Sequence, residues 1–526
     1  MGTSDASGAA PRGSTAFLVA TALVCGALVM MVEVLGSRVI GPFFGVSLFV
    51  WTALIAVTLL ALAAGYAAGG VLADRRGADA LYGIILVSGL LVALIPPLKI
   101  PVLRLCGGLG LRTGALASAA VLFGPALFCL GCVSPFLARL ATRELRSLGR
   151  TVGLLYALST AGSFAGTVLA GFVLIEYAGV DATFFALGAT LVALGLVWFV
   201  ALRRTFATLA AALPLLLLVP AADAPVAKTL PDGVRATRIV NRDTFYGNLK
   251  VIDYDYGATR TRALLIDGQT QGGIDLADGR SPYAYAYFLQ RLPTALRPGG
   301  RRCLVIGLGA GAVPRWYEEQ GIATDVVDIN PGVFALARSH FGYRAAGRAI
   351  VSDARSFLRE GSERYDYVIL DVFNGDTTPS HLVSLEAFAL LRARLAPDGV
   401  LAMNLLGAVR GPETFGTASV VHTLERVFAS VELYPGFPAS AESGNITVIA
   451  RASGGPLDLA RVSLAGVHPF ALPEVLPYLG VRFRFPAGTP ATVLIDDYNP
   501  LDLLELALKE RERRDILRYG DWDLLL

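Results

Sequence analysis

Glycines and aspartates at regular intervals are the residues of this sequence whose types and spacing could support chemistry. Gly307, Gly309 and Gly311 follow a short apolar run, and Asp328 ends a second apolar run about 20 residues later. Glycines at this spacing let a ligand approach the backbone at a helix N-terminus, and the acidic side chain can accept hydrogen bonds from both ribose hydroxyls. The pattern predicts a nucleoside pocket.

Two further aspartates follow strand-like runs. Asp353 comes just after the run that ends near Ser352, and Asp371 ends the run that begins at Tyr365. The carboxyl ends of parallel strands share one edge of an open α/β sheet, which is where such sheets bind ligands. Three carboxylates should therefore meet at that edge. The alternative is that each Asp only caps the helix that follows it.

Alternating strands and helices must hold these residues in place. We expect helices over 384–395 and 413–428, and strands over 399–405 and 445–451. This alternation predicts a doubly wound, mainly parallel sheet, a Rossmann-like domain of the class I methyltransferase type over residues 281–526.

A small β-rich unit should precede that domain, over residues 225–280. Its alternating segments are 234–241, 247–255 and 261–267, and turns separate them. A helix over 281–296 should then lead into the glycine-rich turn.

The first part of the chain is far more apolar than the rest. Hydrophobic residues make up 54% of the 526 residues, and most of the excess lies before residue 224. After a disordered tail at residues 1–14, we expect a multi-pass α-helical membrane domain over residues 15–224, with six or seven helices in the lipid bilayer. The six full spans are expected near 16–36, 47–72, 80–98, 113–138, 152–175 and 181–202.

The charge distribution and the cysteines do not indicate that the chain binds nucleic acid or a metal ion. The net charge is +3 without a dense basic stripe, which argues against nucleic-acid binding. Cys129 and Cys132 have the spacing of a metal or redox pair, but they lie in an apolar segment with no nearby His or acidic ligand. We expect them to pack in a membrane helix, and we expect no metal site.

Several motifs in order resemble one enzyme family. The runs YGNLKV and LLIDGQTQ, the glycine-rich turn, Asp328, Asp353 and the LDVFNGDTTPSHL loop resemble the spermidine synthase (polyamine aminopropyltransferase) family over about residues 240–435. With apolar segments in front, the run GYAAGGVLADRR and the DVFNGD form of the loop, the chain looks like the membrane-fused bacterial spermidine synthase-like branch. Its catalytic domain should transfer an aminopropyl group.

The resemblance implies a role for most of the residues named above. Asp328 would hold the ribose, Asp353 the adenine amino group, the three glycines the nucleoside backbone, and Asp371 would be the catalytic carboxylate that orients the amine and accepts its proton. The donor would be decarboxylated S-adenosylmethionine and the acceptor a polyamine; a homodimer is compatible with this family. The residues implied for the amine pocket are Tyr246, Gln271, Tyr283 and Asp376.

Two departures from the family pattern leave the substrates open. Ala310 stands where the family's turn carries an Asp for the aminopropyl ammonium, and Tyr283, Ala284 and Tyr285 replace a Tyr-His-Glu run. A methyltransferase that uses S-adenosylmethionine itself is a second hypothesis, because Ala310 removes a negative charge that would repel the donor's carboxylate. A non-catalytic sensor or transporter for a polyamine or nucleoside is a third.

The C-terminal run LIDDYNPLD holds further polar residues. Asp496, Asp497 and Tyr498 lie on an expected loop before a terminal helix, where they could close over a cationic ligand or merely cap that helix. His381, in the PSHL loop, is as well explained by a structural hydrogen bond as by proton transfer.

The distribution of Lys and Arg predicts the membrane topology. Basic residues cluster at 75–76, 139–150 and 203–204, which places these loops and the N-terminus in the cytoplasm. The segment 206–221 is short and contains Pro214, so we expect it to lie at the interface without spanning. The protein should then be a multi-pass cell-membrane protein with a cytoplasmic catalytic domain.

Overall fold

The computed structural model describes residues 13–45, 48–142, 148–213, 225–373, 378–453 and 462–525. The chain divides into two compact units, one formed by residues 1–222 with 243–245 and the other by residues 223–242 with 246–526. Each unit is described by itself. A tail was expected at residues 1–14. Residues 1–12 lie outside the described part of the chain, and the first helix begins at Gly13.

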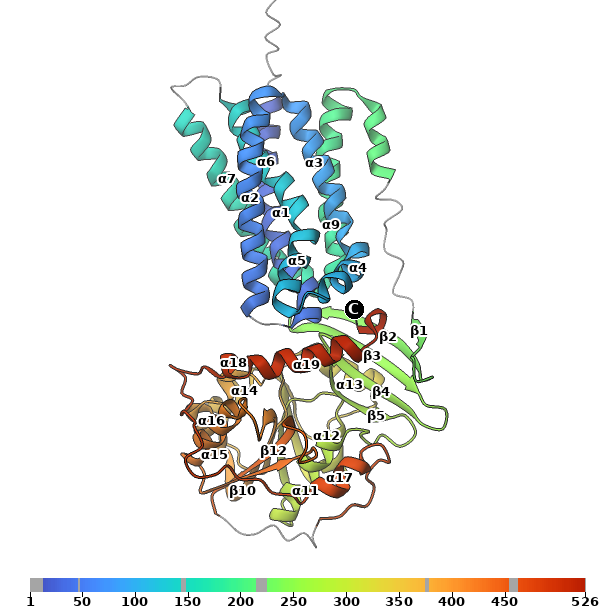
Figure 1. The fold of residues 1–526 in the computed structure, drawn as a ribbon, viewed down its shortest axis with the longest axis vertical. Coiled ribbons are helices and arrows are strands. Elements are labelled where there is room, and N and C mark those ends of the chain that lie inside the picture. Colours follow the sequence, from blue (N-terminus) through green and yellow to red (C-terminus); the bar gives the residue numbers. More distant parts are fainter. Residues whose placement is uncertain are drawn as a thin grey trace, which may run out of the picture. The chain divides into compact units, whose positions relative to one another are not determined.

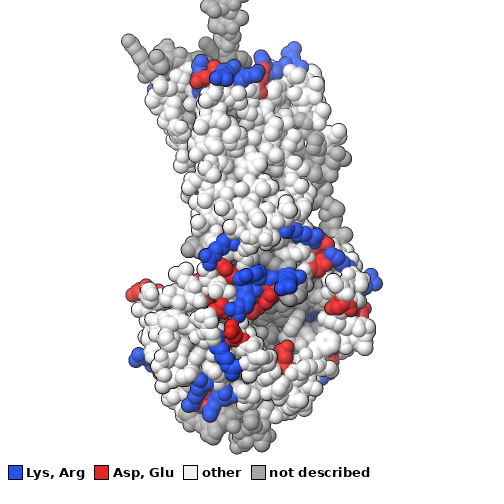
Figure 2. All heavy atoms as spheres, viewed as in Figure 1, with Lys and Arg blue, Asp and Glu red and all other residues white. Residues whose placement is uncertain are grey.

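The first unit is a bundle of apolar helices (Figure 1). Five helices are long and apolar enough to cross a bilayer, and a sixth crossing results if the bent pair α3 and α4 is one span. On the face seen in Figure 2, a band of uncharged side chains covers the middle of this bundle. The helices are α1 (Gly13–Phe44), α2 (Leu48–Arg75), α3 (Ala78–Ala93), α4 (Ile95–Gly107), α5 (Leu111–Leu122), α6 (Gly124–Ala141), α7 (Leu148–Leu169), α8 (Ile175–Tyr177) and α9 (Val180–Leu196).

Two of the expected spans are broken in the structure. The span expected at 80–98 is a helix pair bent by 63°, because the prolines that open α4 cannot continue the hydrogen bonds of α3. The span expected at 113–138 is two helices separated at Phe123, and Pro125 follows the break. Each of these two expected spans therefore consists of a pair of helices.

The shorter segment expected at 206–221 lies only partly within the described residues. Residues Phe206–Ala212 form a 3-10 helix, and residues 214–221 are outside the described part of the chain. Two π-helical stretches, Ala170–Leu174 and Val197–Leu202, continue α7 and α9.

The second unit begins with a five-stranded sheet in the order β1-β2-β3-β4-β5. Strand β5 was not expected, because its sequence QTQGGID lacks apolar alternation; it pairs antiparallel with β4. The strands are β1 (Val226–Thr229), β2 (Arg235–Thr244), β3 (Gly247–Asp255), β4 (Arg260–Ile266) and β5 (Gln269–Asp275).

A seven-stranded sheet in the order β11-β12-β10-β9-β6-β7-β8 forms the centre of this unit. Strands β10, β9, β6, β7 and β8 are parallel, and β12 runs antiparallel between β10 and β11. The expected doubly wound, mainly parallel sheet is confirmed. The strands are β6 (Arg302–Ile306), β7 (Ala323–Asp328), β8 (Ala349–Val351), β9 (Tyr365–Leu370), β10 (Leu395–Ala408), β11 (Ser430–Pro435) and β12 (Ser443–Arg451).

Helices cover both faces of this sheet, because side chains alternate along each buried strand. Val305 faces a core shared with α11 and α12, whereas its neighbour Leu304 faces a core shared with α14 and α15. The helices of this unit are α11 (Ala284–Leu296), α12 (Ala312–Glu319), α13 (Pro331–His340), α14 (Ala354–Glu360), α15 (Leu385–Ala393), α16 (Thr414–Glu425), α17 (Leu472–Tyr478), α18 (Leu501–Leu504), α19 (Leu506–Tyr519) and α20 (Trp522–Leu525).

Candidate active site

The glycine-rich turn lies where the strand order reverses, between β6 and β9. A side chain at Gly307 would collide with the carbonyl oxygen of Asp371, and a Cβ at Gly309 would lie 2.6 Å from the carbonyl oxygen of Gln271. Both glycines have positive φ, +94° and +52°, and Gly311 at +79° opens α12. The turn needs glycine because the end of β9 and strand β5 press against it.

Asp328 joins two loops at the end of β7. One carboxylate oxygen accepts a hydrogen bond from the backbone N–H of Leu308 at 2.9 Å, and the other accepts from that of Asn330 at 2.8 Å. Burial raises the pKa of Asp328 above its ordinary value, although these two hydrogen bonds oppose the rise. The carboxylate thus fixes the shape of the turn, and the residue as a whole is half-buried.

Asp353 lies two residues after β8 and serves as the N-cap of α14. Its Oδ1 accepts a hydrogen bond from the backbone N–H of Ser356 at 2.9 Å, and Nε2 of His381 lies 3.5 Å from its Oδ2. Burial opposes ionisation, but the Ser356 hydrogen bond and His381 lower the pKa of Asp353 overall. Asp353 therefore caps α14, and its second carboxylate oxygen faces the PSHL segment.

Asp371 follows β9 directly and is held by its backbone and its side chain. Its N–H donates to the carbonyl oxygen of Ile306 at 2.8 Å, and its Oδ1 accepts from Nδ2 of Asn404 at 2.9 Å. Burial raises the pKa of Asp371 to about 6, and the Asn404 hydrogen bond limits the rise. This carboxylate is therefore ionised at neutral pH and able to take up a proton just below it.

Asn404 was not expected among the site residues. It lies on β10 and is buried, and its Oδ1 has no hydrogen-bond partner in the part of the chain that the structure describes. A buried amide oxygen without a partner is costly, so it is suited to accept from a bound donor group such as an ammonium. A polar residue inside the apolar run of 399–405 was the signal available in the sequence.

In the sequence, Tyr285 was noted only because it replaces a polar residue of the family pattern. In the structure it faces the glycine-rich turn. Its hydroxyl donates to the carbonyl oxygen of Gln271 at 3.4 Å, and a Cβ built on Gly272 would lie 3.0 Å from that hydroxyl and 3.6 Å from Cβ of Ala310. Burial, followed by the charge of Asp371, raises the pKa of Tyr285. The neutral phenol of Tyr285 and the side chain of Ala310 thus both lie next to Gly272.

Tyr283 lies on the other side of β5. Its ring would come within 3.1 Å of a Cβ on Gly273, and burial, together with Tyr254, raises the pKa of its phenol. Tyr246 lies in the turn between β2 and β3 with 37% of its surface exposed. Asp376 falls outside the described residues.

The C-terminal aspartates lie on a tight turn closed between Ile495 and Tyr498. The carboxylate of Asp496 pairs with Arg355, with Oδ1 2.7 Å from Nη1, and also accepts from the hydroxyl of Ser384 at 2.6 Å. Arg355 in turn donates to the carbonyl oxygen of His381 at 3.0 Å. The structure thus gives Asp496 a protein cation as its partner; Asp497 and Tyr498 are exposed.

The site therefore gathers residues from three regions of the chain. The glycines, Asp328 and Asp371 lie together at one sheet edge, strand β5 brings Gln271, and α11 brings Tyr285. Asp353 is linked to the same edge through the PSHL segment.

Comparison with known proteins finds relatives of the part of the chain that forms this site. No protein-family model matches the chain. A polyamine aminopropyltransferase from Vibrio vulnificus is 29% identical over 225 residues, which cover 40% of this chain and 71% of that protein. The chain is thus similar in sequence to polyamine aminopropyltransferases, and to a spermidine synthase from Dictyostelium discoideum with 25% identity over 33% of this chain and 64% of that protein. A probable spermidine synthase from Corynebacterium glutamicum has a similar structure, with 20% identity, a TM-score of 0.37, and coverage of 44% of this chain and 81% of that one.

One relative of this chain carries a different name. An N-terminal histidine N-methyltransferase from Emericella nidulans is 34% identical over 140 residues, 26% of this chain. This chain spans only 25% of that relative's length. The similarity to the methyltransferase is thus local, whereas the similarity to the Vibrio aminopropyltransferase extends over most of that protein.

Proposed function

We propose that the protein is a membrane-anchored aminopropyltransferase that moves an aminopropyl group from decarboxylated S-adenosylmethionine to a polyamine. The observation that carries this proposal is the position of Asp371. It lies beside the glycine-rich turn, and Asn404 donates a hydrogen bond to its Oδ1, whereas its Oδ2 forms no hydrogen bond with any residue that the structure describes. Asp328, the carboxylate proposed for the ribose, accepts a hydrogen bond from Leu308 of the same turn.

The proposed roles follow from the chemistry of a sulfonium donor. The amine nitrogen attacks the carbon bonded to sulfur, the carbon–sulfur bond breaks, and methylthioadenosine leaves with the bonding electrons. The nitrogen then loses a proton, which Asp371 accepts. Because the leaving group is already good, the chain mainly has to align the amine and exclude water. Gln271, Tyr283 and Tyr246 are proposed to line the amine pocket, and Asp353 to bind the adenine amino group.

A methyltransferase is the second candidate, because two observations favour it. Ala310 is 3% exposed and, like the neutral hydroxyl of Tyr285, lies next to Gly272, so position 310 presents no carboxylate to repel that of intact S-adenosylmethionine. The relative from Emericella nidulans is an N-methyltransferase. In that reaction Asp371 would take the proton of a methylated amine.

We also propose that the first unit is a multi-pass anchor in the cell membrane with the catalytic unit on the cytoplasmic side. Basic residues at the ends of α2, α6 and the Val197–Leu202 stretch support this, since such residues favour the cytoplasm. Arg139 pairs with Asp74 and Arg203 with Asp79, so these segments end on one side of the bundle.

Donor binding and product analysis of the full chain in detergent test the proposal. Calorimetric titrations would compare decarboxylated S-adenosylmethionine, S-adenosylmethionine and methylthioadenosine, and mass spectrometry would identify the product formed with a diamine. An aminopropylated diamine together with methylthioadenosine supports the proposal. A methylated product with S-adenosylhomocysteine supports the second candidate, and no product with either donor contradicts both.

A further inference from the structure

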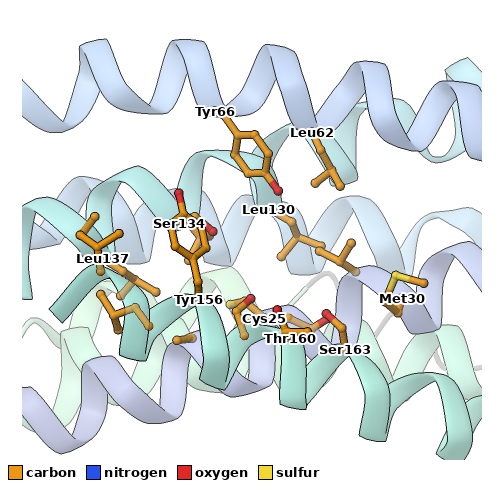
Figure 3. A pocket seen from close by; sticks show the side chains of 18 residues that line it. Cys25, Met30, Leu62, Tyr66, Leu130, Ser134, Leu137, Tyr156, Thr160 and Ser163 are labelled. Atoms are coloured by element: carbon orange, nitrogen blue, oxygen red, sulfur yellow. The ribbon is translucent and has the colours of Figure 1, made fainter. Parts of the chain in front are cut away.

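The helical unit contains a cavity of about 210 Å³ between α1, α2, α6 and α7 (Figure 3). All 18 residues that line it are uncharged. A cavity of about 150 Å³ in a protein core can hold a benzene molecule, so this one has room for a head group of comparable or larger size.

Close helix packing on two sides explains why the cavity forms where it does. Helices α1 and α7 touch through glycines, since a Cβ on Gly166 would lie 2.5 Å from the carbonyl oxygen of Ala27. Helices α2 and α6 do the same, since a Cβ on Gly69 would lie 2.6 Å from Cα of Cys132. Two tightly joined pairs thus face each other, and the space between them is left open.

Two tyrosines reach into this space from opposite sides. Tyr66 extends from α2 toward α7, and Tyr156 extends from α7 toward α2 (Figure 3). They are 47% and 60% exposed, so they form the rim where the cavity opens toward the outside of the bundle. An elongated molecule could leave between them.

Hydroxyl groups without partners make the cavity chemically specific. The hydroxyls of Tyr66, Ser134, Tyr156 and Thr160 form no hydrogen bond with any residue that the structure describes, whereas Ser163 donates to the carbonyl oxygen of Gly26 at 3.0 Å. In a bundle apolar enough to cross a bilayer, unpaired hydroxyls are costly because the hydrocarbon offers no partner. A ligand with its own hydroxyl or carbonyl oxygens would remove that cost.

We propose that this cavity binds an uncharged amphipathic lipid, with a hydroxyl- or carbonyl-bearing head group inside and a hydrocarbon tail leaving between α2 and α7. The uncharged lining selects against phosphate or ammonium head groups, which would have no counter-charge there. The proposal is independent of the transferase chemistry, because all lining residues belong to the helical unit.

Photolabelling of the full chain in lipid nanodiscs tests this site. The probe is a photoactivatable diacylglycerol, and the matched probe is the corresponding phosphatidic acid, which adds only a charged phosphate. Peptide mapping should place the diacylglycerol label on α2 and α7, with at least about tenfold less label from phosphatidic acid. Equal labelling by both probes, or labels mapped elsewhere, would overturn the proposal.

Three variants separate cavity binding from general lipid contact. Ser134→Phe fills the cavity and should lower diacylglycerol labelling about tenfold or more, whereas Val168→Phe, on an exposed part of α7 outside the lining, should leave it unchanged. The double variant Tyr66→Phe, Tyr156→Phe keeps the shape, removes two hydroxyls and should lower labelling severalfold even if Ser134→Phe fails to fold. Parent-level labelling of the double variant contradicts the proposed recognition.

Discussion

Asn404 and Asp371 join the ends of two neighbouring parallel strands, since Nδ2 of Asn404 donates to Oδ1 of Asp371 over 2.9 Å. The register that pairs Met403 of β10 with Leu370 of β9 brings the two side chains abreast. One carboxylate oxygen is fixed in this way, and the protonation of Asp371 depends on a neighbour that cannot itself be ionised.

We expect Asp371→Asn to lower kcat by about 100-fold or more, because the amide cannot accept the amine's proton. Binding of methylthioadenosine should change little, since Asp371 is proposed to face the transferred group. Steady-state kinetics and calorimetry measure the two effects. Asp398→Asn is the control, because Asp398 is exposed and pairs with Arg297 away from this edge. Parent-like turnover in Asp371→Asn would remove this residue from the mechanism.

Asn404→Leu should shift the acidic limb of the pH profile of kcat/KM upward. The limb is expected near pH 6 in the parent, because burial raises the pKa of Asp371 to about 6. The Asn404 hydrogen bond lowers that pKa, so its loss should move the limb to higher pH. An unchanged limb in Asn404→Leu would show that another group controls it.

Asp371→Asn should also stabilise the fold at high pH. The folded-state pKa of about 6 exceeds the ordinary value of 3.8, so the fold disfavours the ionised carboxylate. The resulting destabilisation is absent below about pH 4, grows as pH rises toward 6 and then stays constant at no more than about 3 kcal/mol. Thermal unfolding of both proteins in detergent at several pH values measures this gain. A gain that is the same at pH 4.5 and pH 8 would contradict the assigned cause.

Asp328→Ala should weaken methylthioadenosine binding by roughly 10- to 150-fold, because a charged hydrogen-bond acceptor is lost. Part of this effect arises from the turn, since Asp328 also accepts from Leu308 and Asn330. Calorimetric titration of the full chain in detergent measures the loss.

Asp353→Ser is the matched comparison for the nucleoside pocket. Serine can still cap α14, so the helix start is preserved while the longer carboxylate is removed. Weaker binding of methylthioadenosine by this variant would show that the carboxylate contacts the ligand, because the helix cap is preserved. If both variants bind as tightly as the parent, the pocket lies elsewhere.

Reporter fusions after residue 230 and near the C-terminus should show cytoplasmic activity. This outcome is expected if the segment 206–221 lies at the interface and does not cross the bilayer. A fusion after residue 110, in a loop expected on the other side, is the control. Activity of a periplasm-specific reporter at both sites of the catalytic unit would overturn the topology.

Apolar runs in the sequence were sufficient to predict the centre of the sheet. Strands β6, β7 and β9 are short and buried on both faces, and a glycine or aspartate ends the strand or follows it directly, so their pattern is strong. Strand β11 was missed, because it includes Glu432, a charge that sequence patterns assign to the surface. In the structure this carboxylate is buried and pairs with Arg482 at 2.7 Å.

Residues of the site that depend on tertiary contacts could not be predicted in the same way. Tyr285 gains its position from the close approach of β5 to the glycine-rich turn, and Asn404 from the register of β10 with β9. Neither of these tertiary contacts can be predicted from the spacing of residues along the sequence. Asp496 was expected to be available to a ligand, but the sequence contains no signal that Arg355 would occupy it.

The ion pair between Arg355 and Asp496 also constrains when the site can be completed during synthesis. The two residues are separated by 141 positions, and nearby Asn499 donates to the carbonyl oxygen of Ser380 at 2.8 Å. At about 5 to 20 residues per second, a ribosome adds Asp496 roughly 7 to 28 seconds after Arg355. The PSHL segment therefore gains these contacts only after Asp496 and Asn499 have been synthesised, long after the apolar helices have left the ribosome.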